Sequence, residues 1–212
     1  MGGLNTHPLL TITLAALLTA AGDFLQRAGV DSPRPLAADD LTRTTIRTNS
    51  DYASTRVDGR YAIFYWKGQV RTFIDRDEDF LQILSRDEPG EMARLANTPA
   101  VIDEEQALQT ACEAFRRIGH RDQDYDPPVV FHFTYQPDEF DPAKVVHLPF
   151  FQVKWNLKDF PRTGNLVFDP TIETVVSGRT GHLIYYSSAT MTTHPDPPMA
   201  PEPTFSIDTS RR

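Results

Sequence analysis

The chain has 212 residues, enough for one large domain or two small ones. Its net charge of −8 argues against a nucleic acid as partner, because a phosphate backbone demands clustered Lys and Arg. The same charge argues against anchoring on an anionic membrane surface. The single cysteine, Cys112, excludes an intrachain disulfide and any zinc site built from cysteines.

The first predicted element is a helix over residues 11–28 that ends at Gly29. Residues 8–21 are also apolar enough for the core of a signal peptide, which would place the protein outside the cytoplasm. However, no Lys or Arg precedes this run, and it stops at Asp23, too short to span a bilayer. We therefore expect a helix of the domain, with an extracytoplasmic location only under the signal-peptide interpretation.

A polar, β-branched stretch at residues 42–48 predicts an edge strand. Residues 60–66 and 69–74 predict a hairpin around Lys67-Gly68. Both faces of the first hairpin strand are apolar, which predicts that this strand is covered on both sides. The end of this half is expected to hold a short helix and then a connection between two units, at residues 77–85 and 88–100.

A second helix is predicted to begin at Asp103, with Gln106 three residues later completing a capping box. Its apolar stripe consists of Ala107, Leu108, Ala111, Cys112, Phe115 and Ile118. Strands are predicted at residues 129–135, 151–157, 165–169, 173–176 and 182–186. The Pro-rich residues 191–212 are predicted to be a disordered tail.

Two stretches of the chain read alike, each on a predicted helix with strands behind it. Residues 17–24 and 108–115 both read L-x-T-A-[A/C]-x-x-F. This echo predicts two copies of one small unit. The expected fold class is α+β, with two tandem units at residues 1–90 and 101–190, each a helix packed on a small antiparallel sheet.

The second half also carries an ordered set of short motifs. Residues 104–111 read E-E-x-A-L-x-x-A, residues 151–155 read F-x-V-x-W, and residues 180–183 read T-G-x-[IVL]. This order resembles the PepSY-type domains, small α+β modules of bacterial envelope proteins and protease propeptides. The resemblance covers residues 102–187 and, more weakly, the first half. It implies non-enzymatic binding, often inhibition of a peptidase or an accessory role in the envelope.

The sequence departs from the family pattern at the last hairpin, where the family usually reads D-x-x-T-G-x-[IV]. Ser177 stands at the Asp position, followed by Gly178-Arg179. The helix start and the hairpin turn, both structural motifs, therefore carry most of the resemblance.

Candidate metal ligands are sparse. Among six histidines, His132 and His147 could meet across neighbouring strands with a carboxylate as third ligand, although His132 also fits a solvent-facing strand position. The acidic runs at residues 122–126 and 75–79 lack the Gly and Glu of a calcium loop, so both are interpreted as solvated turns. We predict no metal site.

Catalytic motifs are also missing from the sequence. Cys112 lies on the apolar helix stripe, which predicts a small buried core residue rather than a nucleophile. The sequence contains no G-x-S-x-G, no G-x-G-x-x-G and no Walker-A loop. We therefore predict a protein that is not an enzyme, with no catalytic residues and no cofactor.

Aromatic residues crowd two predicted hairpins, around Phe64 and around Phe151. They are expected to form the core between each sheet and its helix, and any on an uncovered face would form a groove. The expected function is non-catalytic binding of a protein or peptide, with the edge strand at residues 42–48 as one docking site. The alternatives are a small-ligand or hydrolytic domain with an aromatic-lined pocket, and a purely structural spacer.

Overall fold

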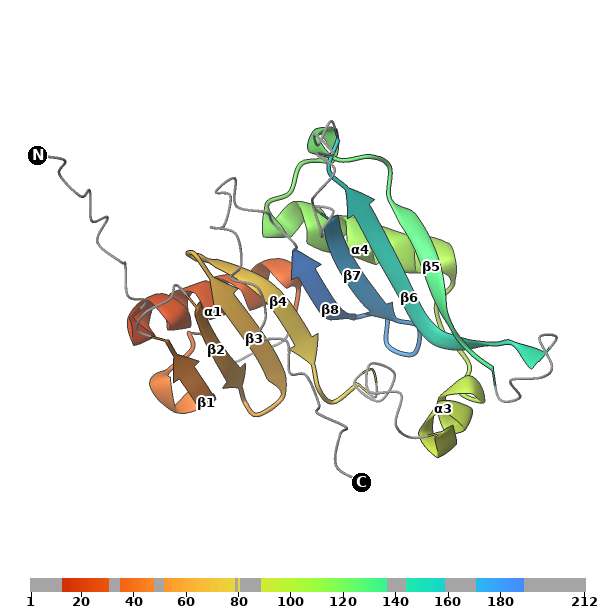
Figure 1. Ribbon diagram of the computed structural model, residues 1–212, viewed down its shortest axis with the longest axis horizontal. Helices are drawn as coiled ribbons and strands as arrows, with labels where there is room; N and C mark the ends of the chain where they lie inside the picture. Colours follow the sequence, from red (N-terminus) through yellow and green to blue (C-terminus); the bar gives the residue numbers. More distant parts are fainter. Residues whose placement is uncertain are drawn as a thin grey trace, which may run out of the picture.

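The computed structural model describes residues 13–30, 35–47, 52–78, 80, 89–136, 144–158 and 171–188. They form helices and one antiparallel sheet, so the α+β class is confirmed (Figure 1). The helices are α1 (Leu14–Ala28), α3 (Pro89–Ala96) and α4 (Glu104–Ile118), with short 3-10 turns at Ala38–Asp40 and Asp122–Asp124. The strands are β1 (Leu41–Ile46), β2 (Tyr52–Val57), β3 (Tyr61–Trp66), β4 (Gln69–Asp75), β5 (Val129–Tyr135), β6 (Val146–Asn156), β7 (Thr171–Ser177) and β8 (Leu183–Ser188).

The eight strands form a single sheet in the order β1-β2-β3-β4-β8-β7-β6-β5. The expectation of two separate small sheets is therefore wrong. β4 and β8 pair in the middle, where Phe73 lies opposite Tyr186. If the sheets were separate, β4 and β8 would each expose a row of backbone N–H and C=O groups without hydrogen-bond partners. Pairing of β4 with β8 provides hydrogen bonds for both rows.

α1 is part of the packed domain. Its N-cap is Thr13, whose side chain accepts from the Ala16 N–H, and its C-cap is Gly29 in the left-handed conformation. Leu17 and Ala21 on its inner face are fully buried. The helix contacts both β4 and α4.

α4 has the capping box predicted at Asp103 and Gln106 and ends at the left-handed Gly119. Its length, N-cap and C-cap match those of α1 at a constant spacing of 90 residues. The repeated letters L-x-T-A are spaced by 91 residues, one position out of step with the caps. One residue turns a helix by about 100°, so the letters occupy different faces: Leu17 corresponds to the buried Ala107, and not to Leu108.

α1 and α4 cover one face of the sheet, and α3 covers part of the other. In Figure 1 both longer helices lie behind the sheet, while α3 lies beside the ends of β5 and β6. Neighbouring residues of β6 show the two layers, because Phe151 belongs to the core under the helices and Phe150 to the core under α3. Leu95 of α3 is fully buried in the second core.

α3 lies where the sequence predicted only a connection. A proline is tolerated in the first turn of a helix, where its missing N–H has no partner to lose. Pro89 begins α3, and Met92, Leu95 and Ala96 then present an apolar stripe to β6 and β5. Of the two prolines that suggested a connection, Pro89 begins this helix and Pro99 follows its end.

Two further expectations for the first half need correction. The hairpin around Lys67-Gly68 is confirmed, but only one face of β3 is buried, and Phe64 and Trp66 on the other face are half-buried. Asp75 belongs to no solvated turn, because it is 3 % exposed and forms a salt bridge with Arg60 at 2.7 Å. The predicted strand at residues 165–169, the tail at 191–212 and most of the short helix at 77–85 lie outside the described residues.

Candidate functional site

The sheet surface of β1–β4 opposite α1 is the first candidate site. Side chains alternate along β2 and β3, so that one set is buried under α1 and the other set is half-buried. We call the second set the open face. It consists of Tyr52, Ser54 and Arg56 from β2, Ala62, Phe64 and Trp66 from β3, and Arg71, Thr72 and Ile74 from β4. Among the described helices, α3 lies on the same side of the sheet as the open face, where it contacts β5 and β6 of the other half.

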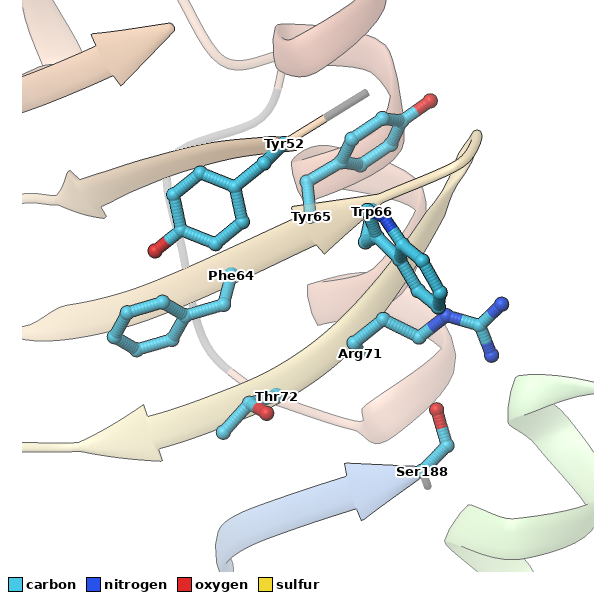
Figure 2. A pocket seen from close by; sticks show the side chains of 7 residues that line it. All are labelled: Tyr52, Phe64, Tyr65, Trp66, Arg71, Thr72 and Ser188. Carbon is cyan, nitrogen blue, oxygen red and sulfur yellow. The ribbon is translucent and has the colours of Figure 1, made fainter. Parts of the chain in front are cut away.

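A bulge shapes the centre of the open face. Phe64 pairs with Thr72, whereas the next residue, Tyr65, pairs with Val70. The extra residue is Arg71, which therefore lies on the same side as Thr72. Figure 2 shows the result, a shallow cavity of about 330 Å³ that is lined by aromatic side chains, Arg71, Thr72 and Ser188.

The strands of the open face carry positive charge in an acidic chain. Residues 41–76 hold seven Lys and Arg against three Asp and no Glu, a local charge of +4 in a chain of net charge −8. Arg60 forms salt bridges with Asp75 and Asp77. The remaining six have no carboxylate partner among the residues described: Arg43, Arg47, Arg56, Lys67, Arg71 and Arg76.

Several of these cations lie against aromatic rings or against each other. The Arg47 guanidinium lies 5.2 Å from the centre of the Tyr52 ring, and the Lys67 ammonium lies 4.7 Å from that of Trp66. Arg71 lies 5.6 Å from the same Trp66 ring. Desolvation and the like charges of Arg43 and Arg76 lower the pKa of Arg56. Repulsion of this kind is unfavourable in the isolated chain, and a bound anion would relieve it.

The edge strands are less suitable for docking than the open face. β1 is an edge of the described sheet, as predicted for residues 42–48. However, its pairing with β2 shifts between Thr42 and Thr45, and Arg43 has a φ of 51°. Bulges of this kind protect an edge against strand addition. The pairing of the other edge, β5, also shifts, between His132 and Thr134.

A cleft on the helix side of the sheet is the second candidate site. It has a volume of about 770 Å³ and lies between α1, the turn that joins β3 to β4, and the end of α4. Asp23 and Arg27 of α1 lie on one side of it, and His120, Tyr125 and Tyr186 lie on the other. Figure 1 shows α1 behind the half of the sheet that holds β1–β4 and α4 behind the other half.

His120 forms the centre of the polar group in this cleft. Its Nε2 lies 2.9 Å from the Tyr186 hydroxyl, and its Nδ1 lies 3.4 Å from the Tyr125 hydroxyl. Burial and, to a smaller extent, the charge of Arg71 lower the pKa of His120 to about 4. Burial raises the pKa of Tyr125 and Tyr186. All three groups are therefore uncharged at neutral pH.

His132 and His147 meet, as the sequence suggested, with ring centres 5.0 Å apart. His132 Nε2 also lies 2.8 Å from a carboxylate oxygen of Glu104, which begins α4. These three side chains still do not form a metal site. In the described part of the chain, no group of three or more His, Cys, Asp or Glu side chains is arranged to hold a metal ion.

The other candidates from the sequence have structural roles. Cys112 is half-buried against the main core, and burial raises the pKa of its thiol, the opposite of nucleophile activation. Asp122 and Asp124 lie in an exposed turn and accept hydrogen bonds from Arg116 and Arg121. This arrangement agrees with a solvated turn.

Comparison with known proteins does not name a relative. No family model, no curated protein and no solved structure matches the chain. Among the described residues, no helix is long and apolar enough to cross a membrane. Both candidate sites therefore depend on their geometry and chemistry alone.

The sequence predicted that aromatic residues around Phe64 would line a groove if their face was uncovered, but it did not predict the cations of the open face or the polar group at His120. The charge of the whole chain, −8, hid the local charge of +4 over residues 41–76, and a count over that window would have found it. The polar group at His120 had no such signal. His120 and Tyr125 are close in sequence, but Tyr186 is 66 residues from His120 and meets it only in the fold.

Proposed function

We propose that the chain is a non-catalytic, PepSY-like binding module whose open face binds an acidic segment of a protein or peptide. The observation that carries the proposal is the set of six cations on and beside β1–β4 that have no carboxylate partner among the described residues, together with Tyr52, Phe64 and Trp66 on the open face. Arginine and aromatic side chains are the residues that most often dominate protein interfaces. Carboxylates of a partner would pair with the guanidinium groups.

We also propose that the module consists of two tandem units joined through β4 and β8. The constant spacing of 90 residues between the caps of α1 and α4 supports this interpretation. So does a bulge at the same place in each half: the register shifts between Phe64 and Tyr65 in β3, and between Val175 and Val176 in β7. Each unit would be a helix followed by four strands, in the order that a PepSY-like pair implies.

Charge distribution favours an acidic polypeptide over a nucleic acid. Outside residues 41–76 the chain carries a net charge of −12. A long phosphate backbone would extend beyond four strands, a width of about 19 Å at the usual strand spacing, and meet this negative surface. A short acidic segment fits within the positive area and presents apolar side chains to the aromatic rings.

The test is a titration of the protein with each of two peptides, in which isothermal calorimetry measures the heat of binding. One peptide is ten residues of alternating Glu and Leu, and the other is the same peptide with Lys in place of Glu. We expect the Glu peptide to bind, with an affinity that falls as salt is raised, because exposed charge pairs are screened. We expect no binding of the Lys peptide.

A matched pair of variants locates the binding. Arg56→Ser removes one charge from the open face, and Arg116→Ser removes one from the exposed surface of α4. Arg56→Ser should lower the affinity for the Glu peptide about fivefold to tenfold. Arg116→Ser should leave this affinity unchanged. The proposal fails if neither peptide binds, if both bind equally, or if the two variants behave alike.

A further inference from the structure

We propose that the cleft between α1 and the end of α4 is a second binding site, for an uncharged ring compound that carries a hydroxyl or carbonyl group. Its volume of about 770 Å³ lies in the range of small-molecule sites in proteins. The cleft lies on the helix side of the sheet, away from the open face. This proposal does not depend on the acidic partner proposed for the open face, but its comparison of the two halves rests on the tandem units proposed above.

The first half of the protein holds apolar side chains at the positions that correspond to two members of the polar group in the cleft. His120 follows Gly119 as Val30 follows Gly29, and in both places the backbone N–H donates to the carbonyl five residues earlier. Val30 is 8 % exposed and is part of the hydrocarbon core. The same backbone position is therefore filled by a hydrocarbon in one half and by an imidazole in the other.

Tyr186 has an apolar counterpart as well. It lies directly opposite Phe73, and the flanking pairs, Thr72 with Ser187 and Ile74 with Tyr185, place Phe73 and Tyr186 at equivalent positions of their strands. Both rings are buried under the helices. A phenylalanine serves the fold at this position, so the Tyr186 hydroxyl and its contact with His120 Nε2 at 2.9 Å have another use.

The chemistry of the polar group selects an uncharged ligand. The two tyrosine hydroxyls and the imidazole each donate and accept hydrogen bonds without carrying a charge at neutral pH. A hydroxyl or carbonyl can join this network. At the His120 end of the cleft, a carboxylate or ammonium group would have to lose its water for hydrogen-bonding partners that carry no charge, which is unfavourable.

The rest of the cleft suits an apolar ring. Phe24 and Ala20 of α1, Tyr65 and Val70 of the β3–β4 hairpin, and Ile118 of α4 form its walls. Asp23 and Arg27 lie on the exposed side of α1, where water solvates both charges. The ligand would therefore direct its polar group toward His120 and its ring toward α1 and the hairpin.

The experiment uses 2-naphthol as the probe, with 2-naphthoate as its charged counterpart, and follows binding to the full chain by NMR and calorimetry. We expect 2-naphthol to bind with a Kd below about 1 mM, the range of a weak small-molecule site. We expect it to shift the ring signals of His120. We expect 2-naphthoate to bind at least about tenfold more weakly, because the polar end offers no charge.

Three variants test the placement. Tyr186→Phe and His120→Val each introduce the residue found at the equivalent position of the first half. Each should lower the affinity for 2-naphthol about threefold to tenfold, which is the effect of losing one hydrogen bond. Tyr185→Phe removes a hydroxyl on the opposite face of the sheet and should have no effect. Arg56→Ser, on the open face, should also leave 2-naphthol binding unchanged.

Four results would overturn the proposal. They are no binding of 2-naphthol to the wild-type chain, no shift of the His120 signals on binding, equal or tighter binding of 2-naphthoate, and unchanged affinity in both Tyr186→Phe and His120→Val. The His120 shift is measured on the wild-type protein, so the test remains decisive if a variant fails to fold.

Discussion

Phe73 and Tyr186 lie directly opposite each other on β4 and β8, the strand pair that joins the two halves of the sheet. The ring of Phe24 from α1 covers both, with ring centres 5.6 Å from Phe73 and 5.1 Å from Tyr186. Both side chains are buried, at 0 % and 2 % exposure. The junction of the halves is therefore an aromatic cluster as well as a backbone ladder.

Phe73→Ala should lower the free energy of unfolding by about 3–5 kcal/mol, because it leaves a cavity under α1 at the junction. Tyr186→Phe should lower it by less than about 1 kcal/mol, since the ring remains and water in the cleft can replace the lost hydroxyl contact. Urea unfolding of the two variants measures both values. Equal losses would contradict the view that the ring, and not the hydroxyl, supports the fold.

Helix α4 offers a comparison between its two faces. Phe115 is fully buried and stacks on Trp155 with ring centres 4.5 Å apart, so Phe115→Ala should cost about 3–5 kcal/mol. Glu113 forms an exposed salt bridge with Arg117 at 2.8 Å, so Glu113→Ala should change stability by no more than about 0.5 kcal/mol. A denaturant melt of each variant provides the values. Comparable losses would mean that the assignment of the two faces is wrong.

Local elements could be predicted from the sequence with fair accuracy. The capping box at Asp103, the turn at Lys67-Gly68 and the alternation of Phe151, Val153 and Trp155 are all confirmed. Each depends on residues that are close in sequence, where capping, turn preference and periodicity act directly. The helix ends were also predicted correctly at Gly29 and Gly119.

The joining of the halves could not be predicted in the same way. The pair of Phe73 and Tyr186 is separated by more than a hundred residues, and no local pattern records which edge strands will meet. The burial of Asp75 likewise depends on Arg60 from the turn between β2 and β3. The repeated letters at residues 17–24 and 108–115 align the two helices one residue out of step with their caps and buried positions.

A buried carboxylate holds the turn between β7 and β8. Glu78, just after β4, is 8 % exposed and accepts hydrogen bonds from Ser177 at 3.1 Å and from Arg179 at 2.7 Å. Glu78→Ala should lower stability by about 3–5 kcal/mol, since it breaks a buried ion pair by removing one partner. Asp77→Ala, which removes a neighbouring carboxylate that is 64 % exposed, should cost less than about 1 kcal/mol. Thermal unfolding of the Glu78→Ala and Asp77→Ala variants measures the two effects. Similar midpoint temperatures in the two variants would contradict a stabilising role for the buried Glu78 carboxylate.

His120 makes stability depend on pH in a defined direction. Its pKa in the folded protein is about 4, below the usual value of about 6.5 in an unfolded chain. Between these values the unfolded chain binds a proton that the folded protein does not. Stability from this residue is therefore complete above about pH 6.5 and is lost as the pH falls toward 4.

We expect this loss to be on the order of 2–3 kcal/mol in the wild-type protein and absent in His120→Val. The groups that face the imidazole, namely Tyr125, Tyr186 and the more distant charge of Arg71, do not titrate in this range. Urea unfolding at pH 7, 5.5 and 4 measures the free energy of unfolding of both proteins. Subtracting one from the other at each pH removes the contribution of the carboxylates, which the two proteins share. His182→Val, at an exposed position, serves as the control and should follow the wild-type curve. A constant difference between wild type and His120→Val across this range would show that the imidazole titrates normally in the folded protein.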